Sequence, residues 1–230
     1  MPPRTWRDLV DERDDAIVLV REWAVAAPFD VEILPCEPAA GRRALEALQV
    51  STRSPLGALA FHTGGLLIVH GWMRVLGGGC ELLPRAIDTW NAIGQAEHRC
   101  SEGLLVADDA SGGFFAWFDQ PRTIHYLAPD TIKWEDLGRG YTDWLAAMMT
   151  DGLTKFYAEL RWKGWPDEIR AVEGSRAMSF YPFLWSKGAP IDERSRRPVP
   201  VEELWSFAMH LRRELAEVPD GAQVRIRLDE

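Results

Sequence analysis

Hydrophobic residues recur at helical spacing in several separate stretches of the chain. Over residues 14–27 the apolar positions lie three or four apart and end at Pro28, which predicts an N-terminal helix. The helix predicted over 200–215 has the clearest end signals, because Pro200 lies at its start, glutamates occupy its first turn and arginines its last. The same spacing predicts helices over 42–49, 82–93, 141–148, 153–160, 165–172 and 200–215.

Shorter apolar runs bounded by glycine, proline or aspartate are typical of β-strands. The run from Ser54 to Met73 holds no charged residue, but its glycines and other polar positions argue against a membrane helix. With Gly64-Gly65 as a tight turn, the run predicts a hairpin of strands 56–62 and 66–75. Further strands are expected over 31–34, 104–107, 114–118, 123–128, 132–135 and 224–228.

These elements predict an α+β fold in which a mostly antiparallel sheet, from about 56 to 135, has helices on its N-terminal and C-terminal sides. The 230 residues fit a single domain, 1–230, with the part from about 165 as a candidate appended lobe. The alternating strand at 224–228 would form a sheet edge. There it could pair with a second copy of the chain, which allows a homo-oligomer.

The net charge of the chain limits the classes of macromolecule that it is expected to bind. Lys and Arg number 26 against 35 Asp and Glu, a net charge of −9. An acidic surface does not neutralise a phosphate backbone, so we expect no nucleic acid and favour a basic protein as partner. The segment Asp11–Asp15 and a predicted loop with Arg194, Arg196 and Arg197 are charged surfaces that could serve docking.

The N-terminus is charged and has no apolar signal region, so we expect a cytoplasmic protein with no membrane partner. The three cysteines include no CxxC pair, which argues against a zinc ribbon or a disulfide framework. In the predicted hairpin His62 and His70 face opposite sides of the sheet and cannot share a metal. We therefore expect neither a metal nor a cofactor.

The sequence contains no motif of a phosphate loop or of a serine nucleophile. The glycines at 77–79 lack the residues of a phosphate loop, and no GxSxG nucleophile turn occurs. Asp108 and Asp109 are adjacent, so in an extended chain their side chains point to opposite sides, and both could act on one bond only if a turn rotated one of them. Their surroundings are typical of a hairpin loop, although a binding role stays open.

A short set of polar and aromatic residues is left as candidates for binding. Arg53 and Arg74 flank the apolar run, and one of them could stack on Trp72. Most of the eleven tryptophans fall on apolar helix faces or in strands, as expected of core. The candidate binding residues are Arg53, His70, Trp72, Asp108, Asp109 and Glu135.

Several strings resemble a bacterial family called domain of unknown function 2625, over about residues 5 to 210. The resemblance implies membership and no activity. It rests on the strings SPLG (54–57), TGG (63–65), HGW (70–72), WN (90–91), ADD (107–109), GGFF (112–115), APD (128–130), WE (134–135) and SFYPFLW (179–185).

The stretch from Leu104 to Phe118, with the helix predicted after Tyr141, more weakly resembles the SUKH superfamily of SMI-type proteins. Many members of that superfamily look like immunity proteins that bind and neutralise toxins. The resemblance implies a SUKH-like fold and a protein partner.

Together these observations favour a non-catalytic protein-binding module, of the immunity type. The alternative is a small-molecule or carbohydrate-binding protein or hydrolase that uses exposed tryptophans with Asp108 or Glu135. A pocket lined by two or more tryptophans and a carboxylate would support that alternative.

Overall fold

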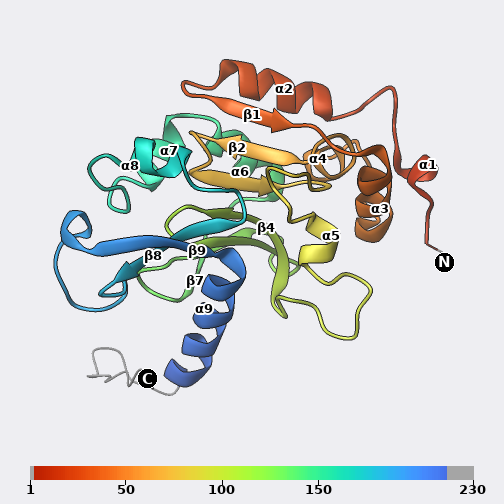
Figure 1. Cartoon of the computed structure of the whole chain (residues 1–230). Coiled ribbons are helices and arrows are strands. Elements are labelled where there is room, and N and C mark those ends of the chain that lie inside the picture. Colours follow the sequence, from red (N-terminus) through yellow and green to blue (C-terminus); the bar gives the residue numbers. More distant parts are fainter. Residues whose placement is uncertain (1–2, 217–230) are drawn as a thin grey trace.

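The computed structural model describes residues 3–216. Within this range seven strands form one antiparallel sheet in chain order, β1-β2-β3-β4-β5-β6-β7, and two further strands form a separate ribbon (Figure 1). The α+β class and the antiparallel sheet are confirmed. The strands of the main sheet are β1 (Val31–Leu34), β2 (Gly65–Ile68), β3 (Met73–Leu76), β4 (Gly103–Asp109), β5 (Phe114–Phe118), β6 (Ile124–Leu127) and β7 (Trp134–Asp136).

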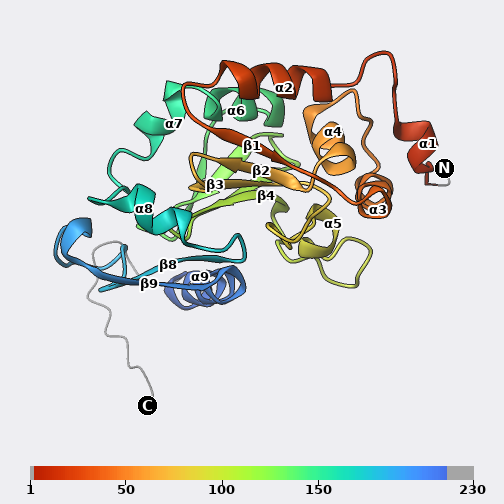
Figure 2. The same ribbon diagram turned by 45° about the horizontal axis from the view of Figure 1, so that its top comes forward.

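Helices cover the sheet from one side, and the ribbon with the last helix lies on the other (Figure 2). None of the helices in residues 3–216 is long and apolar enough to cross a bilayer. The helices are α1 (Trp6–Leu9), α2 (Ile17–Ala26), α3 (Pro38–Leu48), α4 (Pro55–His62), α5 (Ile87–Trp90), α6 (Tyr141–Met148), α7 (Asp151–Phe156), α8 (Trp165–Arg170) and α9 (Val201–Leu215).

The predicted strand 56–62 is wrong, because these residues form helix α4. Ser54 caps the helix by accepting a hydrogen bond from the Gly57 N–H, and Pro55 occupies the first helical position. Residues 55–60 are all buried, so no polar face marks the helical period. A helix buried on every side has the same continuous apolar pattern as a buried strand.

The real hairpin pairs β2 with β3, and its turn, residues 69–72, begins five residues later than predicted. Val69, His70 and Gly71 all have positive φ there, a conformation that favours glycine and is unusual for the other two residues. His62 instead ends α4, beside Asp15. The expectation that the two histidines occupy opposite faces of one hairpin is therefore wrong.

Two further predictions need correction. Only Ile87–Trp90 of the predicted helix 82–93 is helical, consistent with Pro84 and the positive φ of Ala92 interrupting it. The loop expected to expose three arginines is mostly strand β9 (Ser195–Pro200), which pairs with β8 (Arg176–Tyr181). The prolines of β9 are tolerated because it is an edge strand. The predicted strand 224–228 lies outside the described residues.

The ribbon and α9 pack on the same core as the main sheet. Ala177, Met178 and Trp205 belong to one continuous cluster of buried residues with the central strands. The Met178 N–H also donates to the Ala110 carbonyl at 2.8 Å, at the end of β4. The part of the chain beyond 165 is thus joined to the sheet by both apolar contacts and hydrogen bonds.

Candidate functional site

Asp108 forms a buried ion-pair cluster with two arginines. The antiparallel register of β3 and β4 places Arg74 opposite Asp108, and the Arg74 Nε donates to Asp108 Oδ1 at 2.5 Å. Arg85, from the segment before α5, donates to Oδ2 at 2.5 Å. The three side chains are at most 7% exposed. Two cations thus share one carboxylate in the interior, where a lone charge would be strongly destabilising.

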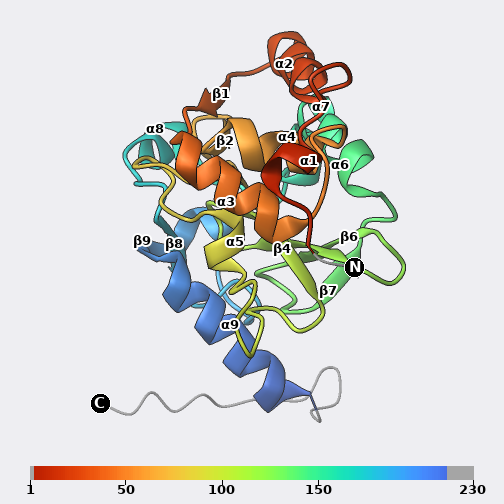
Figure 3. The same ribbon diagram turned by 90° about the vertical axis from the view of Figure 1, so that its right-hand side faces the viewer.

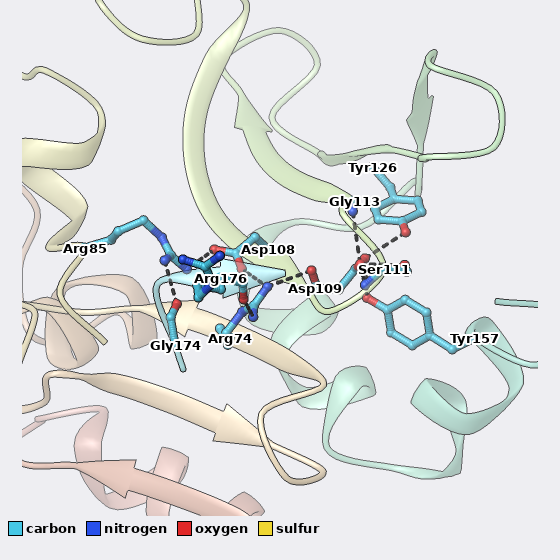
Figure 4. A network of polar contacts seen from close by, with 10 residues as sticks. All are labelled: Arg74, Arg85, Asp108, Asp109, Ser111, Gly113, Tyr126, Tyr157, Gly174 and Arg176. Atoms are coloured by element: carbon cyan, nitrogen blue, oxygen red, sulfur yellow. Dashed lines mark hydrogen bonds and ion pairs between the residues drawn. The ribbon is translucent and has the colours of Figure 1, made fainter. Parts of the chain in front are cut away.

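Backbone carbonyls complete the coordination of both arginines. Arg74 donates to the carbonyls of Arg176 and Asp109 at 2.6 and 2.7 Å, and Arg85 donates to that of Gly174 at 2.6 Å. Burial lowers the pKa of Arg85, and Asp108 opposes that shift. The cluster therefore joins the central sheet to the start of β8 (Figure 4).

Asp109 is the centre of a second buried group. Its Oδ1 accepts from the Ser111 N–H and hydroxyl at 2.8 and 2.6 Å and from the Gly113 N–H at 3.0 Å. Its Oδ2 accepts from the hydroxyls of Tyr126, on β6, and Tyr157, after α7, at 2.7 and 3.0 Å (Figure 4). One carboxylate thereby organises the β4–β5 turn and joins two more elements to it.

The space around Asp109 is filled. A Cβ on Gly113 would lie 2.2 Å from the Tyr126 hydroxyl and 2.5 Å from Asp109 Oδ2, so only glycine fits there without a shift. Asp109 itself is 0% exposed. All four oxygens of Asp108 and Asp109 accept hydrogen bonds from protein donors. Both carboxylates are therefore engaged by donors of the chain itself.

The buried tyrosines make a prediction for alkaline solution. Burial, with the charge of Asp109, raises the pKa of Tyr126 and Tyr157 well above 10. The unfolded chain then loses protons first as the pH rises past about 10, so the free energy of unfolding should fall, by about 1.4 kcal/mol per pH unit for each protected tyrosine. Denaturant titrations from pH 8 to about 12 measure the slope.

Tyr157→Phe should make the fall of the unfolding free energy with pH shallower by about 1.4 kcal/mol per pH unit, the contribution of one protected tyrosine. Tyr181→Phe, at a tyrosine 63% exposed, is the matched control and should leave the slope as in the native chain. Equal slopes for Tyr157→Phe and the native chain would contradict the prediction.

Trp72 lies in an aromatic cluster beside these groups. It is fully buried, its carbonyl accepts from the Ala110 N–H, and its ring contacts Trp162 and Trp165 at centroid distances of 5.4 and 4.9 Å. The cation over its ring is the guanidinium of Arg161, whose Cζ lies 5.2 Å from the ring centroid. The sequence had predicted Arg53 or Arg74 in that position. Burial lowers the pKa of Arg161.

The other three candidates have partners outside these two carboxylate clusters. Arg53 is exposed and pairs with Asp14 at 2.9 Å. His70 contacts Asp30 and Arg170 from the β2–β3 turn. Glu135, on β7, is exposed and accepts from Thr131. The structure thus brings Trp72, Asp108 and Asp109 together and separates the rest, while a binding role for the six stays a prediction.

The sequence-based interpretation left Arg74, Arg85, Tyr126 and Tyr157 out of the site. One signal could have found Arg74, because it is the single charge within the apolar strand Met73–Leu76 and the apolar strand β4 ends in two carboxylates, Asp108 and Asp109. Opposite charges in neighbouring buried strands indicate a cross-strand ion pair. No local pattern indicates the two tyrosines, since each resembles an ordinary core aromatic.

The fold and the buried clusters define the class: an α+β protein whose antiparallel sheet is cross-linked internally by two saturated carboxylates. The chain belongs to the family described as a protein of unknown function DUF2625, whose model matches residues 6–204. This confirms the family resemblance. The resemblance to the SUKH superfamily stays a prediction.

Two curated relatives are similar to this chain over most of its length. The chain is 33% identical over 214 residues to the putative uncharacterized protein YbfG of Escherichia coli K12, covering 91% of this chain and 97% of the relative. It is 31% identical over 208 residues to an uncharacterized protein of Haemophilus influenzae, covering 86% and 91%. No solved structure matches the chain.

Proposed function

We propose that the protein acts by binding another protein and carries out no reaction of its own. The observation that carries this proposal is an aromatic platform, defined as Tyr181, Phe183, Trp185 and Phe207. Phe183, Trp185 and Phe207 line a pocket of about 50 Å³ between β8 and α9, and Tyr181 stands beside it on β8. The pocket walls include Met178, Phe180, Leu184, Leu204 and Ala208.

The platform is ordered by ring contacts. Phe183 and Trp185 stack with centroids 5.6 Å apart and planes 7° from parallel, and Phe207 of α9 lies 4.9 Å from Phe183. Tyr181 is 63% exposed at its rim. Aromatic side chains with arginine are enriched at protein interfaces, and a small apolar pocket at their centre suits one anchoring side chain of a partner.

Arg194 holds the platform loop in one conformation. Its guanidinium donates to the carbonyls of Pro182, Phe183, Ser186 and Ala189, which span the loop between the two ribbon strands. A loop that is ordered before binding loses less conformational entropy when a partner docks. The surface is therefore prepared for binding by the chain's own side chains.

The net charge of −9 favours a basic partner, since opposite charges accelerate association. Immunity to a basic toxin in the cytoplasm is the narrower form of the proposal, and the SUKH resemblance supports it. The carbohydrate or hydrolase alternative gains no support from this pocket. Its lining holds a single tryptophan and no carboxylate, and both candidate aspartates are buried and saturated.

The direct test is photo-crosslinking in host cells from a benzophenone amino acid placed at Tyr181. We expect a discrete product that contains one basic protein. Leu82, 55% exposed on a different segment, is the matched control site and should give no such product. No product from 181, or the same products from both sites, would contradict the proposal.

The partner found in this way should bind the purified protein, and Phe183→Asp should weaken that binding by about tenfold or more, because Phe183 contacts three platform rings. Circular dichroism confirms that the variant is folded. If the partner stops growth when expressed alone, co-expression of the native chain and not of the variant should restore it. Growth arrest that persists with the native chain would contradict the immunity form.

A further inference from the structure

Arg161, in the segment between α7 and α8, is a half-buried arginine without a counter-ion. Two of its guanidinium nitrogens, Nε and Nη2, are buried and have no hydrogen-bond partner. No carboxylate within residues 3–216 forms an ion pair with it. Arg74 and Arg85 each donate instead to a carboxylate and to a backbone carbonyl. An unpaired buried guanidinium is destabilising, so its presence requires a physical reason.

Three aromatic rings surround this guanidinium. Its Cζ lies 4.4 Å from the ring centroid of Trp165, 5.2 Å from that of Trp72 and 5.9 Å from that of Tyr157. The rings of Trp165 and Tyr157 are inclined at 72° and 74° to the ring of Trp72, so they meet the cation from different directions. Ring faces attract the positive charge, but they do not supply the oxygen lone pairs that satisfy N–H donors.

The unsatisfied groups around Arg161 are donors. The indole N–H of Trp72, which is 0% exposed, also lacks an acceptor. Burial lowers the pKa of Arg161, and no carboxylate in the described part of the chain opposes that shift, whereas Asp108 does so for Arg85. Unused donors beside an uncompensated positive charge are complementary to an anion that brings its own acceptors.

The guanidinium can be reached from outside. Its third nitrogen, Nη1, makes no hydrogen bond to the described residues and, unlike Nε and Nη2, is not buried. Helices α7 and α8 lie at the end of the molecule away from α1 and α3, at the left in Figures 1 and 2 and behind the sheet in Figure 3. Nη1 and Nη2 share one end of the planar group, so a carboxylate on Nη1 comes within reach of Nη2 as well.

We propose that Arg161 and its aromatic cage, Trp72, Tyr157 and Trp165, bind the carboxylate group of a ligand. A planar monoanion matches both the flat guanidinium and its single charge. A phosphate dianion calls for a second free cation, and Arg170 of α8 is already bound to Asp167 and His70. The carboxylate can belong to a free small acid or to a side chain of another protein.

Nuclear magnetic resonance of the arginine Nε–H groups, with sodium acetate as the probe, tests the proposal. The signal of Arg161 is identified by its loss in Arg161→Lys. We expect it to shift saturably at constant ionic strength, with a dissociation constant of about 1–10 mM, because one guanidinium supplies most of the attraction. Exposed Arg139 is the matched control and should show no saturable shift. Acetamide, which has the same shape but no charge, should leave both signals unchanged.

Thermal unfolding gives a second measurement. Acetate at about 100 mM should raise the unfolding midpoint of the native chain by about 5 °C over sodium chloride of the same concentration, because it binds the folded state. Arg161→Met keeps the cage filled without charge and should lose this rise, while Arg139→Met should keep it. An Arg161 signal that does not saturate, or an equal rise in Arg161→Met, would overturn the proposal and leave the cage a purely structural cation–π contact.

A capped glutamate peptide, acetyl-Ala-Glu-Ala-amide, distinguishes the two sources of the carboxylate. Binding about tenfold tighter than acetate would identify a protein side chain as the ligand. Binding weaker than acetate would identify a free small acid, and either result supports the carboxylate site. These titrations use the purified chain alone, so their outcome does not depend on the partner sought by crosslinking at Tyr181.

Discussion

Replacing Asp109 by alanine is expected to lower the free energy of unfolding by about 5 kcal/mol. The carboxylate accepts five hydrogen bonds in a fully buried site, from two backbone N–H groups and three hydroxyls. Its loss leaves donors from Ser111, Gly113, Tyr126 and Tyr157 without an acceptor, and each buried unpaired donor costs about 1–3 kcal/mol. Urea denaturation of the two proteins measures the difference.

Asp109→Asn should be less severe, because the amide keeps one oxygen acceptor and a tyrosine hydroxyl can accept from its NH₂ group. Asp130→Ala, at an exposed aspartate in the β6–β7 turn, is the matched control and should change stability by less than about 0.5 kcal/mol. An Asp109→Ala protein as stable as this control would show that the group does not organise the turn.

The second large effect is expected for Asp108→Asn, a loss of about 4 kcal/mol. This substitution keeps the shape of the side chain but removes its charge, so Arg74 and Arg85 stay buried with no counter-charge. The two guanidinium groups also contribute like-charge repulsion, which Asp108 now offsets. Equilibrium unfolding and the shift of the thermal midpoint measure the loss.

Removing all three charges together should recover much of that loss. In the triple variant Arg74→Met, Arg85→Met and Asp108→Leu no ion stays buried, and buried ion pairs replaced by apolar groups of similar volume are often neutral or stabilising. Recovery should be incomplete, because three backbone carbonyls lose their donors. A triple variant no more stable than Asp108→Asn would mean that the unpaired buried charges do not cause the loss of stability in Asp108→Asn.

Periodicity predicted those elements that are buried on one side. Helix α9 has acidic residues in its first turn, basic residues in its last and an apolar stripe facing the core, so its extent agrees with prediction to within a residue. Helix α4 was predicted as a strand, because it is buried on every side and has no polar face. The error then displaced the hairpin turn and with it the positions of both histidines.

The sequence likewise predicted only part of the candidate site. The sequence alone indicated that Asp108 and Asp109 were special, since two adjacent charges close an apolar strand. It could not indicate their partners. Arg74 reaches Asp108 through the register of β3 and β4, Arg85 comes from an irregular segment, and Tyr157 reaches Asp109 from 48 residues away.

The sequence by itself therefore determined the fold class, the family, and most of the helices and strands that have one polar side, because alternation of polar and apolar residues is a local property. Only the tertiary structure decided that two candidate carboxylates are saturated in the core and that the aromatic platform is exposed. Those outcomes depend on which distant segments supply hydrogen-bond donors and cover apolar faces, and local sequence patterns do not encode such contacts.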